Sequence, residues 1–144
     1  MIQITKIFYF EMAHAIAGYE GPCSQIHGHS YVLHVTIRGS KGKDDFIPSP
    51  GMLFDFKQLK AIVNDGIIRQ LDHKLLLSKY FLKNSKTEMS GNNLVTWEVE
   101  PTAENMVIFM QSVITELLPE GICLVSLKLY ETRDSYAEWL ADLH

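Results

Sequence analysis

The segment at residues 27–38 reads HGHSYVLHVTIR, and its side chains alternate between apolar and polar. The apolar set starts at Tyr31 and takes every second residue to Ile37, and His27 and His29 fall on the same parity. Successive side chains of a strand point to opposite faces of its sheet. The segment therefore predicts a half-buried strand whose first two histidines face the core.

A second alternating segment precedes it at residues 2–14. Its apolar side is formed by Ile2, Ile4, Phe8, Phe10 and Met12. His14 continues this apolar set, so its imidazole is also expected on the core face. If the two segments pair as a hairpin, three imidazoles converge at one end of it.

Three converging imidazoles predict a zinc site made by His14, His27 and His29. Neutral imidazole nitrogen is the commonest metal ligand, and three protein ligands with one open position are typical of catalytic zinc. The alternative is that one or more of these residues are core histidines held by hydrogen bonds. A β-bulge at Gly28 would also spoil the shared parity.

Composition predicts a single domain over residues 1–144, because 47% hydrophobic and 21% charged residues suit one core of this size. A net charge of -4 leaves no basic surface for a nucleic-acid partner. No apolar stretch is long enough to span a membrane, and the chain starts directly with a strand pattern. We therefore expect a cytoplasmic protein with neither nucleic acid nor membrane as a partner.

Two helical patterns follow the strands. The first spans residues 56–71, with Asp55 as its capping residue. The second begins after the capping residue Thr102 and carries Glu104 in its first turn, where a carboxylate suits the helix dipole. Residues 78–101, between the helices, are expected to form a long loop or insertion that includes a short extra strand at 94–99.

The last part of the chain reads as two more strands, at residues 123–131 and 136–140. Cys123 and Glu131 both fall on the apolar parity of the first of these strands. Cys123 is expected to be a core thiol. A buried carboxylate is costly without a partner, so Glu131 is expected to bind a heterocycle that offers two N–H donors, or to form an inter-strand salt bridge.

Three further polar residues are candidates for proton transfer. Cys23 lies in a loop just before His27, where it is a base or nucleophile, a fourth zinc ligand or an inert thiol. Asp72 and His73 follow the first helix, where they offer an orienting carboxylate and an imidazole. The alternative for this pair is simple complementation of the helix dipole.

Six sequence pieces occur in order along nearly the whole chain. They are FEMAH (10–14), CSQIHGHSY (23–31), DFKQLK (55–60), LDH (71–73), PTAEN (101–105) and ET (131–132). Together they resemble the signature of the 6-pyruvoyltetrahydropterin and 6-carboxytetrahydropterin synthase family. The resemblance implies an α+β tunnelling fold, in which a four-stranded antiparallel sheet with two helices on one face closes a barrel in a trimer or a hexamer.

The same resemblance implies roles for seven residues. In the family three histidines bind zinc, a cysteine transfers protons, an Asp-His pair supports it from a neighbouring subunit, and a glutamate anchors the pterin ring. By motif position these residues are His14, His27, His29, Cys23, Asp72, His73 and Glu131.

The substrate that the resemblance implies is 7,8-dihydroneopterin triphosphate, which loses triphosphate. The cysteine at position 23 argues against the subgroup of the family that serves folate synthesis, because that subgroup has a glutamate at this position. We expect the product to be 6-carboxy-5,6,7,8-tetrahydropterin, with acetaldehyde, in queuosine biosynthesis; 6-pyruvoyltetrahydropterin is the alternative. The chain departs from the family pattern at Leu76-Leu77, where Leu-Asn is common, and in its long segment at 78–101.

Two other classes fit part of the pattern. A cupin-like three-histidine oxygenase also has His-x-His on a strand, but such jelly rolls consist almost wholly of strands. A non-catalytic zinc module would leave Cys23, Asp72, His73 and Glu131 without a role, and a closed structural site normally needs a fourth protein ligand.

Overall fold

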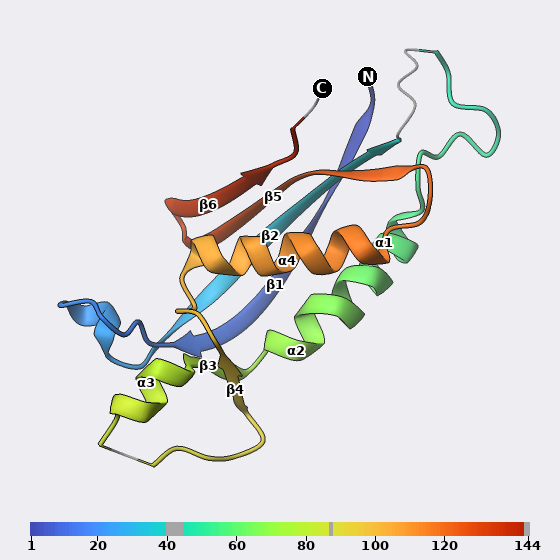
Figure 1. The fold of residues 1–144 in the computed structure, drawn as a ribbon. Coiled ribbons are helices and arrows are strands. Elements are labelled where there is room, and N and C mark those ends of the chain that lie inside the picture. Colours follow the sequence, from blue (N-terminus) through green and yellow to red (C-terminus); the bar gives the residue numbers. More distant parts are fainter. Residues whose placement is uncertain (40–44, 87, 143–144) are drawn as a thin grey trace.

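The computed structural model is built around one twisted sheet of six strands (Figure 1). It describes residues 1–39, 45–86 and 88–142. The strands are β1 (Gln3–His14), β2 (His27–Gly39), β3 (Lys74–Ser78), β4 (Leu94–Trp97), β5 (Ile122–Thr132) and β6 (Ser135–Leu140). The helical segments are η1 (Pro22–Ser24), α1 (Phe56–Val63), η2 (Asn64–Ile68), α2 (Arg69–Leu71), α3 (Lys79–Asn84) and α4 (Ala103–Leu117).

The expected hairpin is present, and its register decides where the histidines meet. β1 and β2 pair antiparallel along their length, with His14 opposite His27 and Met12 opposite His29. The pairing continues without interruption through Gly28, so all three imidazoles keep the core parity. The alternation in the sequence therefore predicted this part of the fold correctly.

The sheet is larger than the four antiparallel strands that the sequence predicts. Its order is β4-β3-β1-β2-β5-β6, in which β1, β2, β5 and β6 form the expected antiparallel set. β3 and β4 add two parallel strands beside residues 12–14 of β1. β3 is a short apolar run directly after a helix, so it has no alternation by which to recognise it. Within residues 78–101, β4 matches the short extra strand expected at 94–99, whereas α3 is a helix where a loop was expected.

The first helix begins as expected and then changes its hydrogen-bond pattern. The Asp55 carboxylate caps α1 by accepting a hydrogen bond from the backbone N–H of Lys57 at 2.8 Å. The helix continues through the π-helical segment η2 into α2. A Cβ on Gly66 of η2 would lie 2.7 Å from Leu117 Cδ1 and 3.1 Å from Val113 Cγ1. Glycine therefore permits the close approach of this helix to α4.

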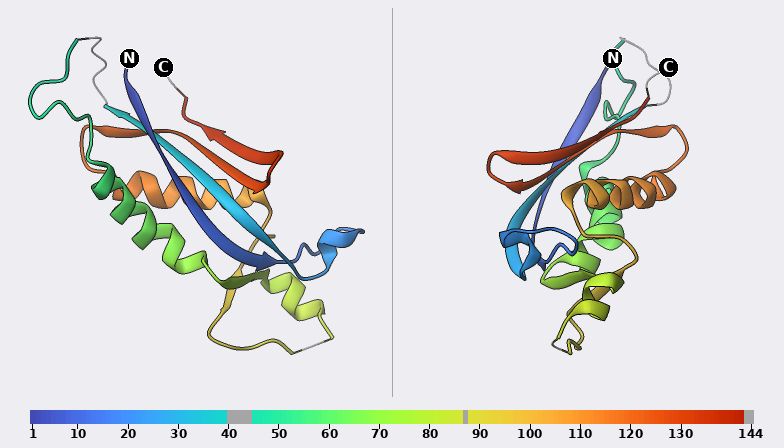
Figure 2. Two further views of the ribbon diagram at one scale, coloured as in Figure 1. Left: turned by 180° about the vertical axis from the view of Figure 1, so that it is seen from behind. Right: turned by 60° about the vertical axis from the view of Figure 1, so that its left-hand side comes forward.

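α1, α2 and α4 cover one face of the sheet, and the core lies between them (Figure 2). Thr102 is the N-cap of α4, and its Oγ1 accepts a hydrogen bond from Asn105 N at 3.2 Å, as the sequence predicts. The core side chains include Leu33, Val35, Leu127, Leu129, Leu59, Ile67, Met106, Met110 and Ile114. No helix of the described residues is long and apolar enough to cross a membrane.

The prediction that Cys123 is a core thiol is wrong. The register between β2 and β5 shifts after Thr36, which faces Ser126, so that Ile37 faces Leu124. This bulge inverts the parity of the preceding residues of β5. Leu124 therefore enters the core, and Cys123 is only half-buried.

Candidate metal centre and active site

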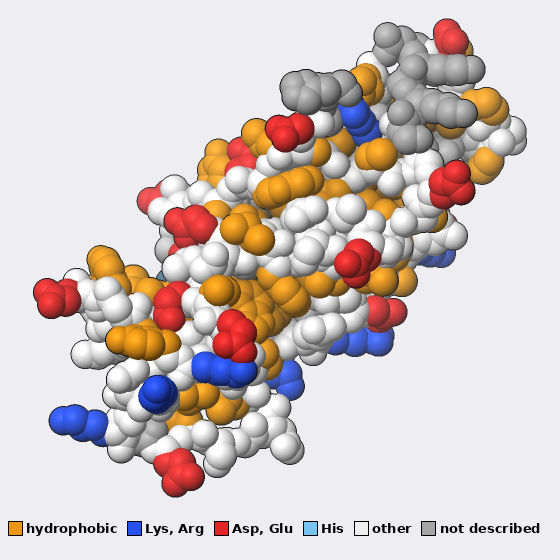
Figure 3. Space-filling view, viewed as in Figure 1, with side chains coloured by type: hydrophobic (Ala, Val, Ile, Leu, Met, Phe, Trp, Pro, Cys, Tyr) orange, Lys and Arg blue, Asp and Glu red, His pale blue; other side chains and the backbone are white. Residues whose placement is uncertain are grey.

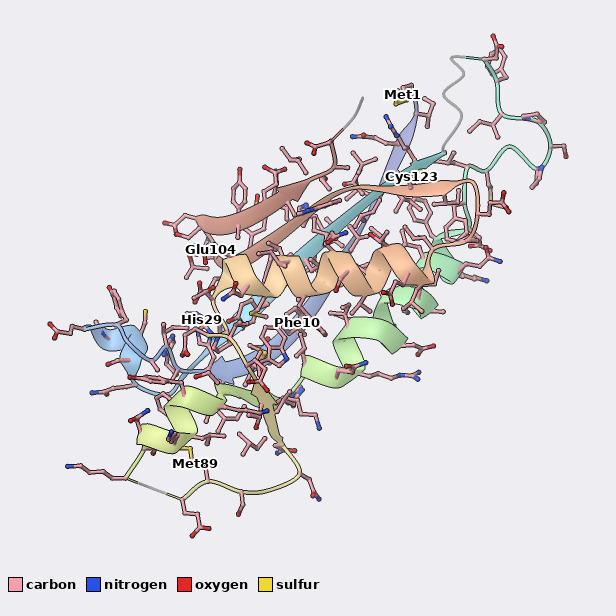
Figure 4. All side chains as sticks on the ribbon, in the orientation of Figure 1. Met1, Phe10, His29, Met89, Glu104 and Cys123 are labelled. Atoms are coloured by element: carbon pink, nitrogen blue, oxygen red, sulfur yellow. The ribbon has the colours of Figure 1, made fainter. Side chains whose placement is uncertain are left out.

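The ends of three strands bring four potential metal ligands together. His14 ends β1, His27 and His29 begin β2, and Glu131 lies near the end of β5. One ligand atom from each residue lies within 4.8 Å of every other. Figure 4 labels His29 in this region, beneath the start of α4 that Glu104 marks. The predicted convergence of the three histidines is therefore present in the structure.

Backbone carbonyl groups orient two of the imidazole rings. The carbonyl oxygen of Pro101 accepts a hydrogen bond from His14 Nδ1 at 2.8 Å, and that of Gln25 accepts one from His27 Nδ1 at 2.7 Å. A neutral ring that donates from Nδ1 presents a lone pair at Nε2. The two Nε2 atoms lie 3.1 Å apart. Two facing lone pairs at this distance require a cation between them, either a proton or a metal ion.

Glu131 completes the cluster with a carboxylate. Its Oε1 lies 3.2 Å from His14 Nε2 and 2.9 Å from His29 Nε2. The contact with His14 holds the pKa of Glu131 below its ordinary value, although burial opposes this shift. Burial lowers the pKa of His29, and the neighbouring histidines add to that effect while Glu131 opposes it. The lowered pKa values of His29 and Glu131 favour a neutral imidazole and an ionised carboxylate, the forms in which these two groups bind a metal ion.

These distances fit a small divalent ion. Zinc bonds of about 2.0–2.2 Å in a tetrahedron place neighbouring ligand atoms roughly 3.3–3.6 Å apart. Three contacts between cluster atoms, of 2.9, 3.1 and 3.2 Å, are close to that spacing, and all four ligand atoms lie within 4.8 Å of one another. Three imidazoles and one carboxylate are also ligand types that zinc accepts. The cluster can therefore hold a metal ion.

The sequence did not predict that Glu131 would join the histidines. It was expected to contact a heterocycle or a basic residue of a neighbouring strand, and the structure shows it against two imidazoles. Its apolar parity on a strand beside β2 was the available signal. Parity alone does not show which residues the end of β5 meets.

The structure places Cys23 outside this ligand cluster. The residue belongs to the η1 turn, and its side chain is exposed. Its carbonyl oxygen accepts a hydrogen bond from Ile16 N at 2.8 Å, which holds the turn against the end of β1. The Cys23 thiol is therefore exposed and is not one of the clustered ligand atoms.

Asp72 and His73 form a pair that is anchored to β1. Asp72 Oδ1 lies 3.0 Å from His73 Nδ1 and accepts a hydrogen bond from the backbone N–H of Glu11 at 2.9 Å. His73 adopts a left-handed conformation with φ 59°, and 79% of its side chain is exposed. Such a conformation in a residue other than glycine is often found at functional sites. Among the described contacts, none joins Cys23 to this pair.

A cavity of about 490 Å³ lies next to Glu131. α4 contributes Ala103, Glu104, Val107 and Ile108 to its wall, and β6 contributes residues 135–139. Apolar side chains also gather on the surface along α4 (Figure 3). The volume suits a small-molecule ligand. Glu104, interpreted from the sequence as a helix-terminal acid, thus supplies a second carboxylate to the cavity.

Comparison with known proteins gives consistent results. The family model of 6-pyruvoyl tetrahydropterin synthase matches residues 3–141. The 6-carboxy-5,6,7,8-tetrahydropterin synthase of Rickettsia typhi is 32% identical over 142 residues, which cover 96% of this chain and 99% of the relative. The 6-pyruvoyl tetrahydrobiopterin synthase of Dictyostelium discoideum is 33% identical over 116 residues, covering 81% of this chain and 71% of that protein.

The fold is also similar to that of solved structures. The 6-pyruvoyl tetrahydropterin synthase of Plasmodium falciparum superposes with a TM-score of 0.75 at 18% identity, over 99% of this chain and 98% of that one. The likeness in fold agrees with the match in sequence, which spans nearly the whole chain. The chain therefore belongs to the 6-pyruvoyl tetrahydropterin synthase family.

Proposed function

We propose that this protein is a zinc-dependent lyase that converts 7,8-dihydroneopterin triphosphate and one water molecule to 6-carboxy-5,6,7,8-tetrahydropterin, acetaldehyde and triphosphate. The observation that carries the proposal is the cluster of three histidines and Glu131 beside a cavity of about 490 Å³. The name of the Rickettsia typhi relative supports this product. The name of the Dictyostelium relative supports 6-pyruvoyltetrahydropterin as the alternative. We place the reaction in queuosine biosynthesis in the cytoplasm.

In this proposal His14, His27 and His29 hold the zinc ion, which when bound supplies Lewis acidity toward the hydroxyl groups of the substrate's side chain. Glu131 lines the cavity and accepts hydrogen bonds from the N–H groups of the pterin ring. Cys23 Sγ takes and returns a proton of the side chain.

The Asp72-His73 pair supports the thiol from a neighbouring subunit. Asp72 Oδ1 contacts His73 Nδ1 and so leaves Nε2 to exchange a proton with Cys23 Sγ. The side chain of His73 is mostly exposed, so its ring is accessible to a neighbouring subunit, as such a role requires.

Open sheet edges support a trimeric or hexameric assembly. β6 forms one edge of the sheet, and β3 covers β1 only at residues 12–14. The side of β1 before residue 12 that faces away from β2 therefore has no strand partner within the described chain. Two open edges on one subunit can pair with those of its neighbours around a closed ring. The contact between neighbouring subunits would then lie beside the ends of β1, β2 and β5, which carry the proposed metal ligands.

The proposal is tested by metal analysis and product analysis of the purified protein. We expect about one zinc per chain, and the release of triphosphate and acetaldehyde from 7,8-dihydroneopterin triphosphate. His27→Ala should lose both zinc and turnover, because it removes a ligand whose Nε2 lies 3.1 Å from that of His14. Iron with oxygen consumption would instead indicate an oxygenase, and zinc without turnover a structural metal site.

Glu131→Gln should weaken pterin binding while zinc remains bound, because in this proposal the three histidines hold the ion without the carboxylate. The substitution replaces one carboxylate oxygen by an N–H donor that faces the donors of the ring. Breaking a buried charged hydrogen-bond pair costs about 2–5 kcal/mol, so KM and the Kd of a pterin product should rise at least tenfold. The exposed Glu120→Gln is the matched control. Unchanged pterin affinity, or loss of zinc, would contradict this role of Glu131.

A further inference from the structure

Two adjacent residues before α4 contact both the metal cluster and the loop that carries Cys23. The carbonyl oxygen of Pro101 accepts the hydrogen bond from His14 Nδ1, at 2.8 Å. The carboxylate of Glu100 accepts a hydrogen bond from the backbone N–H of Ala17, at 2.7 Å between Oε1 and N. Residues 100 and 101 therefore contact both the proposed zinc ligand His14 and Ala17, which lies in the loop that follows it.

The loop between β1 and β2, residues 15–26, is held at two successive amides. The first, Ile16 N, donates to the carbonyl oxygen of Cys23 at 2.8 Å. The second, Ala17 N, donates to Glu100. Glu100 thus holds Ala17, the neighbour of Ile16, and the amide of Ile16 is hydrogen-bonded to Cys23.

Glu100 is itself fixed to the start of α4. Its carbonyl oxygen accepts hydrogen bonds from Asn105 Nδ2 and from Thr102 N, each at 2.9 Å. Its side chain is half-buried. A hydrogen bond from an amide to a carboxylate is stronger than one to a neutral acceptor. The first turn of α4 therefore provides a fixed base from which the carboxylate holds the loop.

We propose that Glu100 is a positioning residue that fixes the Cys23 loop relative to His14. The inference rests on the proposed function, in which the Cys23 thiol moves a proton of a substrate bound at the metal. Proton transfer requires hydrogen-bond reach between the thiol and the substrate. Looseness in the loop should lower kcat, whereas substrate binding depends on Glu131 and the cavity and should change little.

The test compares Glu100→Ala with Glu100→Gln. Alanine removes the acceptor, so we expect hydrogen exchange in residues 15–26 to be about tenfold faster or more. We expect kcat to fall about 10- to 100-fold, with KM and zinc content unchanged. The amide oxygen of glutamine can still accept from Ala17 N, so Glu100→Gln should recover most of the exchange protection and most of kcat. Glu98→Ala is the matched control, because Glu98 pairs with Lys79 at the surface.

Each other outcome overturns the positioning role. Unchanged exchange in Glu100→Ala would show that the carboxylate does not hold the loop. Faster exchange with unchanged kcat would show that the contact between Glu100 and the loop does not affect the reaction. Loss of zinc would show that Glu100 stabilises the metal site instead. Exchange and zinc are measured without substrate, so these results are distinct from failure of the proposed function, which would appear as wild-type protein without turnover.

Discussion

Cys23→Ala is expected to retain about one zinc per chain and to lose kcat by about 10²- to 10⁴-fold, the usual contribution of a general acid or base. The physical reason is the separation of the thiol from the ligands. The cluster of His14, His27, His29 and Glu131 contains no sulfur, and Cys23 lies exposed in the adjoining loop. Zinc is measured by elemental analysis, and turnover by the release of triphosphate.

Cys123→Ala is the matched control for this experiment. Cys123 is half-buried near the start of β5, at the opposite end of that strand from Glu131. Its replacement should leave both zinc content and turnover at the wild-type level. If Cys23→Ala loses its metal, the thiol is a ligand, and if it keeps full turnover, another group moves the proton.

Oligomers that contain both Cys23→Ala and His73→Ala chains are expected to regain activity that neither variant has alone. If each site combines Cys23 of one chain with Asp72 and His73 of its neighbour, random mixing restores an intact site at about one interface in four. The structural basis for this expectation is the exposed side chain of His73, which contacts Asp72, and Asp72 in turn is hydrogen-bonded to β1.

The two variants can be co-expressed with different tags and purified through both tags in turn. Mass measurement then shows that the assemblies contain both chains. Separately purified variants that are mixed without subunit exchange should stay inactive, and they serve as the control. Mixed assemblies as inactive as their parents would show that the Asp72-His73 pair serves its own chain or has only a structural role.

Local patterns in the sequence were sufficient for several elements. The alternation of residues 27–38 predicted both the strand and the inward direction of His27 and His29, which the pairing of β1 and β2 confirms. Asp55 and Thr102 marked the starts of two helices because capping depends on a few neighbouring residues.

Other elements depend on contacts that no local pattern contains. β3 forms because a short apolar run finds backbone partners on both sides, in β1 and β4. The bulge opposite Thr36 inverts the parity of Cys123, and a one-residue shift of this kind leaves no mark in the alternation of β5.

The sequence by itself determined that three imidazoles face one side of a hairpin, because parity follows from the two-residue repeat of a strand. Only the tertiary structure decided what meets them there. Pro101 contacts His14 across 87 positions of the sequence, and Glu100 contacts Ala17 across 83. Glu131, which also contacts His14, belongs to the last part of the chain. Such contacts depend on how the helices and strands pack together, and packing is set by the whole core and not by any short stretch of residues.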